Sequence, residues 1–253
     1  DLYFGSDRYY SSGIFLEFGR LIKTPSDSIL KFDYVSKHWV LGQEINTPSL
    51  HHTENISKMD YPYNGWLFLG FKKEFFKKPN LGYGWEIQFG STGAEASLAK
   101  VFQNTYHTYI INAKQLTWAS SIPQAFHLNL NLSFFWGKPF NDKIKFITRN
   151  KIQLGSFRTS INSRYGIQFG SLKGLPFFGN RLEILENGFS FFLGMELENN
   201  FHDYSLSGSL FSQSSPFNLV AEKLRNKYQA GFIYFKLPWK VNFLFNNTSR
   251  YIK

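Results

Sequence analysis

The chain has no cysteine among its 253 residues. This absence excludes disulfide bonds, thiolate nucleophiles and zinc sites built on cysteine. The sequence also has no window that approaches the roughly 18 to 20 uninterrupted apolar residues needed by a membrane-spanning helix. The composition therefore argues against a helical membrane protein.

Acidic residues are scarce relative to basic ones. Lys and Arg number 28 and Asp and Glu 18, which leaves a formal net charge of +10. Such a balance favours an anionic partner, either nucleic acid or a phosphorylated lipid surface. The basic residues form no dense run and no RNA-binding signature, so we expect no nucleic-acid partner and favour the lipid surface.

Aromatic residues are abundant. The chain has 29 Phe and 14 Tyr beside many Asn, Ser and Gly, and its mean hydropathy is −0.28. The clearest pattern runs from Phe126 to Trp136, where apolar residues at every second position alternate with His, Asn and Ser. This length and period are typical of a transmembrane β-strand, whose apolar face contacts lipid.

Nine further segments have a weaker strand pattern. They are 13–21, 39–45, 66–76, 82–89, 144–154, 159–169, 189–197, 228–235 and 239–245. Two more strands are expected near 29–35 and 204–211, for about ten to twelve in all. Since an open strand edge is not tolerated in lipid, we predict one all-β domain over residues 1–253, a closed antiparallel transmembrane β-barrel of about 12 strands. A soluble β-sandwich also alternates and stays open as the alternative.

One segment breaks the strand pattern. Thr92-Gly93-Ala94-Glu95 has the spacing of a helix capping box, and the residues that follow are compatible with helix. We therefore predict a short helix around 93–107. Gln103 and His107 are four residues apart, so on a helix they would leave the same face, as suits a base and its polar neighbour.

Several motifs resemble the outer-membrane lipid A 3′-O-deacylase family. The Gly-rich turn 90–94 with Gln103-Asn104 and His107 is similar to the family's Gln-Asn-x-x-His signature, and the block 7–13 is similar to its Asp-Arg-Tyr-Tyr-Thr-Asn-Gly. Further matches follow in family order. They are Gln43, Thr47-Pro48-Ser49, the segment Asp60-x-Pro62-Tyr63-x-Gly65-Trp66, Gly194-x-Glu196 and Leu206-x-Gly208.

The resemblance implies a calcium-dependent enzyme that removes the 3′-linked acyl chains of lipid A. Its members are 12-stranded barrels in the outer membrane of Gram-negative bacteria. By this resemblance His107 is the general base that takes a proton from water, Gln103 orients His107 or the water, and Ser11 stands where the family has a catalytic-site Thr. Asp1 matches an acidic residue associated with the metal. Lipid A and outer-membrane lipids are then the partners, and we expect a monomer.

The sequence departs from the family at several positions. Ser11 replaces Thr but keeps the hydroxyl, Tyr61 replaces an Arg, and the family's basic pair after Thr-Pro-Ser is not clearly present. Two other functions therefore stay open. One is an outer-membrane phospholipase, which would need a Ser-His pair, and the other is a non-enzymatic small barrel.

Overall fold

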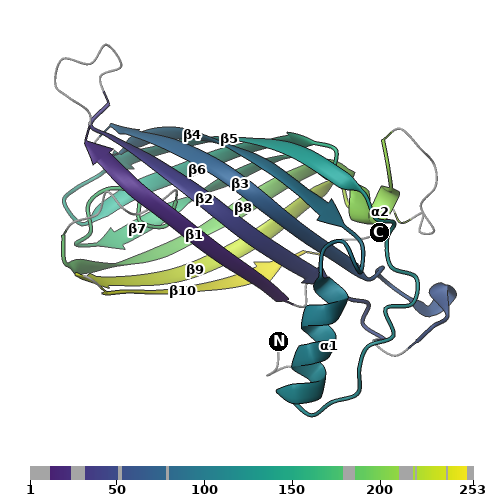
Figure 1. Cartoon of the computed structure of the whole chain (residues 1–253). Helices are drawn as coiled ribbons and strands as arrows, with labels where there is room; N and C mark the ends of the chain where they lie inside the picture. The colour runs from purple at the N-terminus through teal and green to yellow at the C-terminus, as the bar shows by residue number, and fades with distance from the viewer. Residues whose placement is uncertain are drawn as a thin grey trace.

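The computed structural model describes residues 12–23, 32–50, 53–77, 80–178, 186–210, 219, 221–237 and 239–249. These residues form ten strands, two α-helices and one 3-10 helix, η1 (Ile56–Lys58) (Figure 1). The strands are β1 (Ser12–Lys23), β2 (Tyr34–Asn46), β3 (Asn64–Lys77), β4 (Leu81–Thr92), β5 (Phe126–Pro139), β6 (Ile144–Gly155), β7 (Arg158–Gly170), β8 (Gly188–Asp203), β9 (Leu224–Lys236) and β10 (Trp239–Thr248). The helices are α1 (Ala99–Tyr109) and α2 (Tyr204–Ser207).

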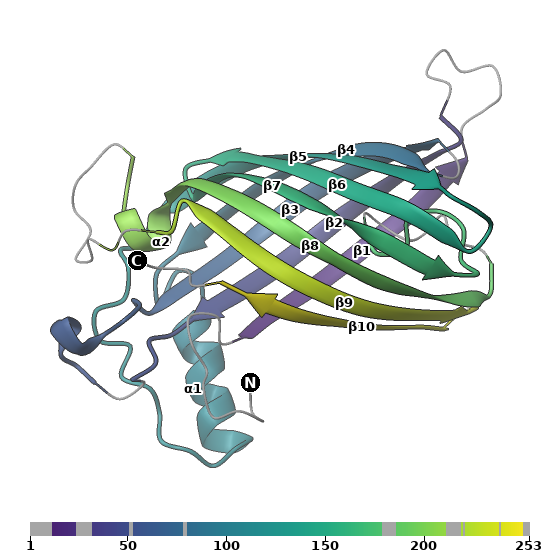
Figure 2. The same cartoon turned by 180° about the vertical axis from the view of Figure 1, so that it is seen from behind.

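All ten strands belong to one sheet in the order of the chain, and each neighbouring pair is antiparallel. The sheet curls into a half-barrel (Figures 1 and 2). The predicted antiparallel all-β fold is thus confirmed. Closure and the count of about 12 strands are not confirmed, because no pairing joins β1 to β10 among the described residues.

Each of the ten predicted strand segments lies within an observed strand. The two additional predicted strands are not found within the described residues. Tyr204–Ser207 forms α2 instead, because Asp203 accepts a hydrogen bond from the amide of Ser205 and caps a helical turn. Of the segment 29–35 the structure describes residues 32–35, and among these Tyr34 and Val35 open β2.

The two faces of the sheet differ in polarity. Apolar side chains lie on the outer face and polar ones on the inner face, which is the reverse of a water-soluble protein. On the convex face of β5, Phe126 and Leu128 are 71% and 60% exposed, whereas His127 and Asn129 on the concave face are 3% and 4% exposed. Apolar side chains are exposed and polar ones buried, as expected for a wall that contacts lipid. This pattern excludes the soluble sandwich, whose apolar face would be inside.

The concave face is filled by side chains. At the end distant from α1, residues 171–178 fold inward and their apolar side chains pack in one cluster with those of four strands. The cluster consists of Phe135, Ile147, Leu172, Leu175, Phe177, Phe178, Phe192, Ile233 and Phe235. The guanidinium of Arg164 lies 4.9 Å from the centre of the Phe178 ring.

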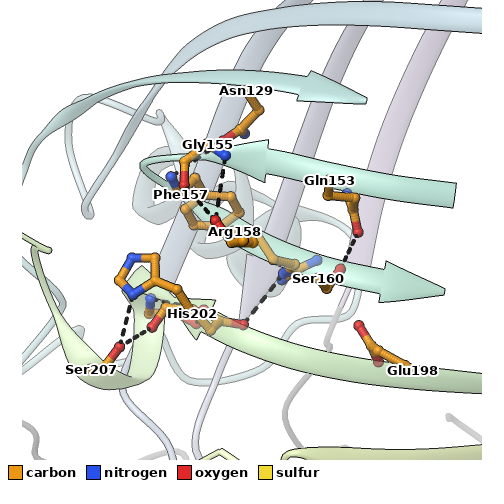
Figure 3. A network of polar contacts seen from close by, with 12 residues as sticks. Asn129, Gln153, Gly155, Phe157, Arg158, Ser160, Glu198, His202 and Ser207 are labelled. Atoms are coloured by element: carbon orange, nitrogen blue, oxygen red, sulfur yellow. Dashed lines mark hydrogen bonds and ion pairs between the residues drawn. The ribbon is translucent and has the colours of Figure 1, made fainter. Parts of the chain in front are cut away.

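Polar groups bridge the strands between this cluster and the opposite rim. Glu196 contacts Lys227 at 3.1 Å, and Glu198 contacts Arg225 at 2.8 Å. Figure 3 shows the part of this network near α2, where Ser160 donates a hydrogen bond of 2.9 Å to Gln153. Such contacts give the inward-facing polar groups hydrogen-bond and ion-pair partners, which lipid and apolar side chains cannot provide.

Aromatic side chains cover the concave face at the rim near α1. The Trp66 ring stacks on Phe157 at 4.5 Å, and His127 lies edge-on to Tyr204 at 4.4 Å. Both nitrogens of His127 have partners, Thr92 Oγ1 at 3.1 Å and Ser156 Oγ at 3.2 Å. His127 is therefore a structural residue of the concave face.

Candidate functional site

Helix α1 packs against the convex face of β2 and β3 at the rim of the sheet (Figures 1 and 2). Gly65 permits the close approach, since a Cβ there would lie 1.9 Å from Ser97 Oγ and 2.3 Å from Ala99 Cβ. Gln43 holds the segment before the helix, because its Nε2 donates a 2.6 Å hydrogen bond to the Ser97 carbonyl. Two strands thus position the start of α1.

The predicted capping box is wrong, and the helix begins at Ala99 rather than near residue 93. The Thr92 hydroxyl contacts His127 and the carbonyls of Pro123 and Ala125 instead of a helix amide. Leu98 takes the N-cap position with φ 57°, and Glu95 pairs with Lys100 at 3.0 Å. Tertiary contacts therefore decide where this helix starts.

Gln103 and His107 lie on one face of α1, as predicted. Ala99, Gln103 and His107 follow one another at intervals of four residues, and their exposure rises from 0% at Ala99 through 8% at Gln103 to a half-buried His107. The helix face thus leaves the wall gradually, and the imidazole stands at its open end. Gln103 Oε1 is buried and has no hydrogen-bond partner among the described residues.

The His107 ring is held by a backbone carbonyl. Its Nδ1 lies 3.2 Å from the Lys114 oxygen. Because a carbonyl only accepts, Nδ1 carries the proton in this contact, and in the neutral ring Nε2 keeps its lone pair. In this orientation Nε2 of the neutral ring is left as the nitrogen that can accept a hydrogen bond or a proton.

Asn104 fixes the loop that carries this carbonyl. Its Nδ2 donates to the Leu116 carbonyl at 3.2 Å, and its Oδ1 accepts from the Leu116 amide at 2.9 Å. Leu116 packs in a buried cluster with Ala99, and in the same cluster Trp118 lies 5.1 Å from Tyr63. The loop after α1 is thus tied both to the helix and to the wall.

The matched segment that begins at Asp60 ties a second rim loop. Asp60 accepts a 2.8 Å hydrogen bond from the Ser49 amide, and the Tyr61 hydroxyl contacts Ser205 Oγ at 2.9 Å. Burial, with the nearby Asp203 carboxylate, raises the pKa of Tyr61 above its ordinary value. The neutral phenol therefore braces the connection between β2 and β3 against α2.

The other two predicted site residues, Ser11 and Asp1, lie outside the described residues. Their predicted roles stay predictions, and so does their proximity to His107. In the described part of the chain no group of three or more His, Asp or Glu side chains is placed to hold a metal. On α1, the amide oxygen of Gln103 has no hydrogen-bond partner among the described residues, and oxygen is the ligand type that calcium binds.

Three positions gain a role that the sequence did not assign. Gln43, Asn104 and Gly65 belonged to the matched motifs, yet only the structure shows that they place α1 and its loop. Nothing in the sequence could have identified the Lys114 carbonyl as a partner of His107, since every residue has a backbone carbonyl. Its role depends on the path of the loop alone.

The comparisons with known proteins agree with this architecture. The family model described as "Outer membrane protein LpxR" matches residues 1–253. The solved structure of LpxR from Salmonella typhimurium superposes with a TM-score of 0.78 at 17% identity, over 98% of this chain and 85% of that one, which shows a shared fold. No curated protein matches. The chain therefore belongs to the LpxR family of lipid A 3′-O-deacylases and is a protein of the outer membrane.

Proposed function

We propose that this protein is a calcium-dependent esterase that hydrolyses the 3′-linked acyl chains of lipid A, with His107 as the general base. The observation that carries the proposal is the pairing of an imidazole oriented by the Lys114 carbonyl with the unpartnered oxygen of Gln103 one turn away. Both groups lie on the helix face that starts at the lipid-facing wall.

His107 Nε2 takes a proton from water, and the hydroxide oxygen forms a bond to the ester carbonyl carbon. The imidazolium then returns the proton to the alkoxide when the ester C–O bond breaks, so water and ester become acid and alcohol. Gln103 orients the attacking water through its free amide oxygen. No covalent intermediate with a serine is needed.

Bound calcium would stabilise the negative charge that develops on the carbonyl oxygen. Asp1 would supply a carboxylate for it by family resemblance. Ser11 contributes a hydroxyl to the same site by resemblance. The rim position of α1 suits the substrate, since the ester bonds of lipid A lie at the headgroup boundary of the outer leaflet.

The contacts of the described residues favour this function over the two alternatives. A phospholipase with a Ser-His pair would need a serine on His107, but no described hydroxyl bonds its ring. The Ser156–His127 pair is enclosed by Trp66 and Tyr204 on the concave face, and no carboxylate of the described residues bonds it. A channel is disfavoured because side chains fill the concave face.

The test is incubation of the purified protein with lipid A in detergent, followed by mass spectrometry. We expect loss of the 3′-linked acyl chains with calcium, none after chelation by EDTA, and recovery when calcium is restored. Phosphatidylethanolamine under the same conditions should stay intact. Unchanged lipid A in calcium would contradict the proposal, and release of fatty acid from the phospholipid would favour the phospholipase.

We further expect Asn104 to act as a positioning residue for His107. Asn104→Ala removes both hydrogen bonds to Leu116 and frees the loop that carries the Lys114 carbonyl. A lost hydrogen bond of about 1.4 kcal/mol corresponds to a roughly tenfold lower kcat, with a smaller change in KM because the substrate contacts stay.

The matched control for Asn104 is Gln115→Ala. This change removes another tie between helix and loop, the exposed 3.0 Å bond from Gln115 to Thr108. Steady-state kinetics of both variants on lipid A give the kcat and KM values to be compared. Equal kcat values for Asn104→Ala and Gln115→Ala would show that Asn104 does not position the base.

A further inference from the structure

Helix α1 has a second face, which the proposed reaction does not use. Leu98, Val101, Phe102 and Tyr109 are 46%, 55%, 47% and 79% exposed and follow the three-and-four spacing of one helix face. The face with Gln103 and His107 lies on another side. None of the helices in the described residues is long and apolar enough to span a bilayer.

This apolar face continues the lipid-facing surface of the sheet. Phe89 lies near the end of β4, before the α1 segment, and Phe126 begins β5 after it; these side chains are 58% and 71% exposed and their rings stack at 5.9 Å. Figures 1 and 2 both show α1 running across the strand direction at the rim. When the strands cross a bilayer, a helix in this orientation lies along its surface.

We propose that the exposed face of α1, defined by Leu98, Val101, Phe102 and Tyr109, is embedded among the acyl chains of the outer leaflet. A short helix with one apolar and one polar face lies in the interfacial plane of a membrane. Lys100, on a different side, stays at the level of the headgroups, where its charge remains hydrated. Lipid rather than protein covers the face because the surface is continuous with the wall that contacts lipid.

The consequence concerns the height of the site in the membrane. The apolar face fixes α1 at the boundary between acyl chains and headgroups, and the imidazole of His107, on another side of the same helix, is held at that depth. The proposal rests on the outer-membrane location of the protein and not on the reaction. It therefore stands or falls separately from the deacylase function.

The lack of cysteine makes a direct test possible, because one introduced cysteine takes a nitroxide label uniquely. Variants Phe102→Cys and Lys100→Cys compare two sides of α1, while Leu128→Cys and Asn141→Cys serve as lipid and water references. The full chain is reconstituted in vesicles of phosphatidylethanolamine and phosphatidylglycerol. Electron paramagnetic resonance then measures collisions with oxygen and with a water-soluble nickel chelate.

We expect the oxygen-to-nickel ratio at Phe102 to approach that at Leu128, and the ratio at Lys100 to approach that at Asn141. A label at Phe102 as open to nickel as one at Lys100 would overturn the proposal. Shielding from both reagents would also overturn it, since it indicates cover by a second copy or another protein. Should Phe102→Cys not fold, Val101→Cys on the same face replaces it, with insertion verified at Leu128.

Discussion

Replacing His107 by alanine should lower the rate of lipid A deacylation by about 10²- to 10⁴-fold, the usual contribution of a general base. The imidazole is held by the Lys114 carbonyl and makes no other hydrogen bond among the described residues, so its loss removes the base and little of the packing. Binding of lipid A should change less than kcat. The measurement is the initial rate of 3′ acyl release by mass spectrometry, in calcium, over a range of lipid A concentrations.

Two further variants separate a chemical role of His107 from a structural one. Thr105→Ala removes an exposed side chain from the same helix and should leave the rate unchanged. Added imidazole should restore part of the activity of His107→Ala, because a free base can enter the space left by the ring. Full activity of His107→Ala would refute the assignment of the base, and failed rescue with a disordered helix would point to packing.

The wall was predictable from sequence because it follows one local rule. In β5 the alternation of Phe126, His127 and Leu128 already separates the lipid-facing from the inward-facing side chains, and register follows from that pattern. The same holds, less regularly, for the other nine strands. Closure of the barrel is different, since it depends on pairing between distant edges that no local pattern encodes.

The candidate site was predictable only in part. The spacing of Gln103 and His107 correctly placed both on one helix face. The start of the helix was not predictable, because the Thr92 hydroxyl is taken by His127 and by the carbonyls of a distant loop. Tertiary contacts of Thr92, which a single sequence does not show, override its local preference for capping a helix. Asp1 and Ser11 lie outside the described residues, so their placement stays a prediction.

The close packing of the α1 segment on Gly65 of β3 leads to the second prediction with a large expected effect. Gly65→Ala should lower kcat by about 10²-fold, the loss that a roughly 1 Å misplacement of a reacting group can cause. The new Cβ would lie 1.9 Å from Ser97 Oγ and 2.3 Å from Ala99 Cβ. Neither neighbour can yield, since Ser97 is fully buried and its hydroxyl bonds the Gly93 carbonyl. The start of the helix must then move away from the wall and carry His107 with it.

Gly70→Ala is the matched control, the same substitution in the same strand. Its Cβ would lie 3.1 Å from the carboxylate end of Glu86, which can turn aside, and at ordinary contact distances of 3.5 Å from Val40 Cβ and 3.6 Å from Gln88 Cγ. We expect near-normal deacylation from Gly70→Ala and an unchanged far-UV circular dichroism spectrum from both variants, because the strand ladder stays intact. Equal activity of the two variants would show that α1 does not depend on its seat at Gly65. Lost β-structure in Gly65→Ala alone would place the role of this glycine in the wall, whereas lost activity with an intact wall places it in the alignment of the base.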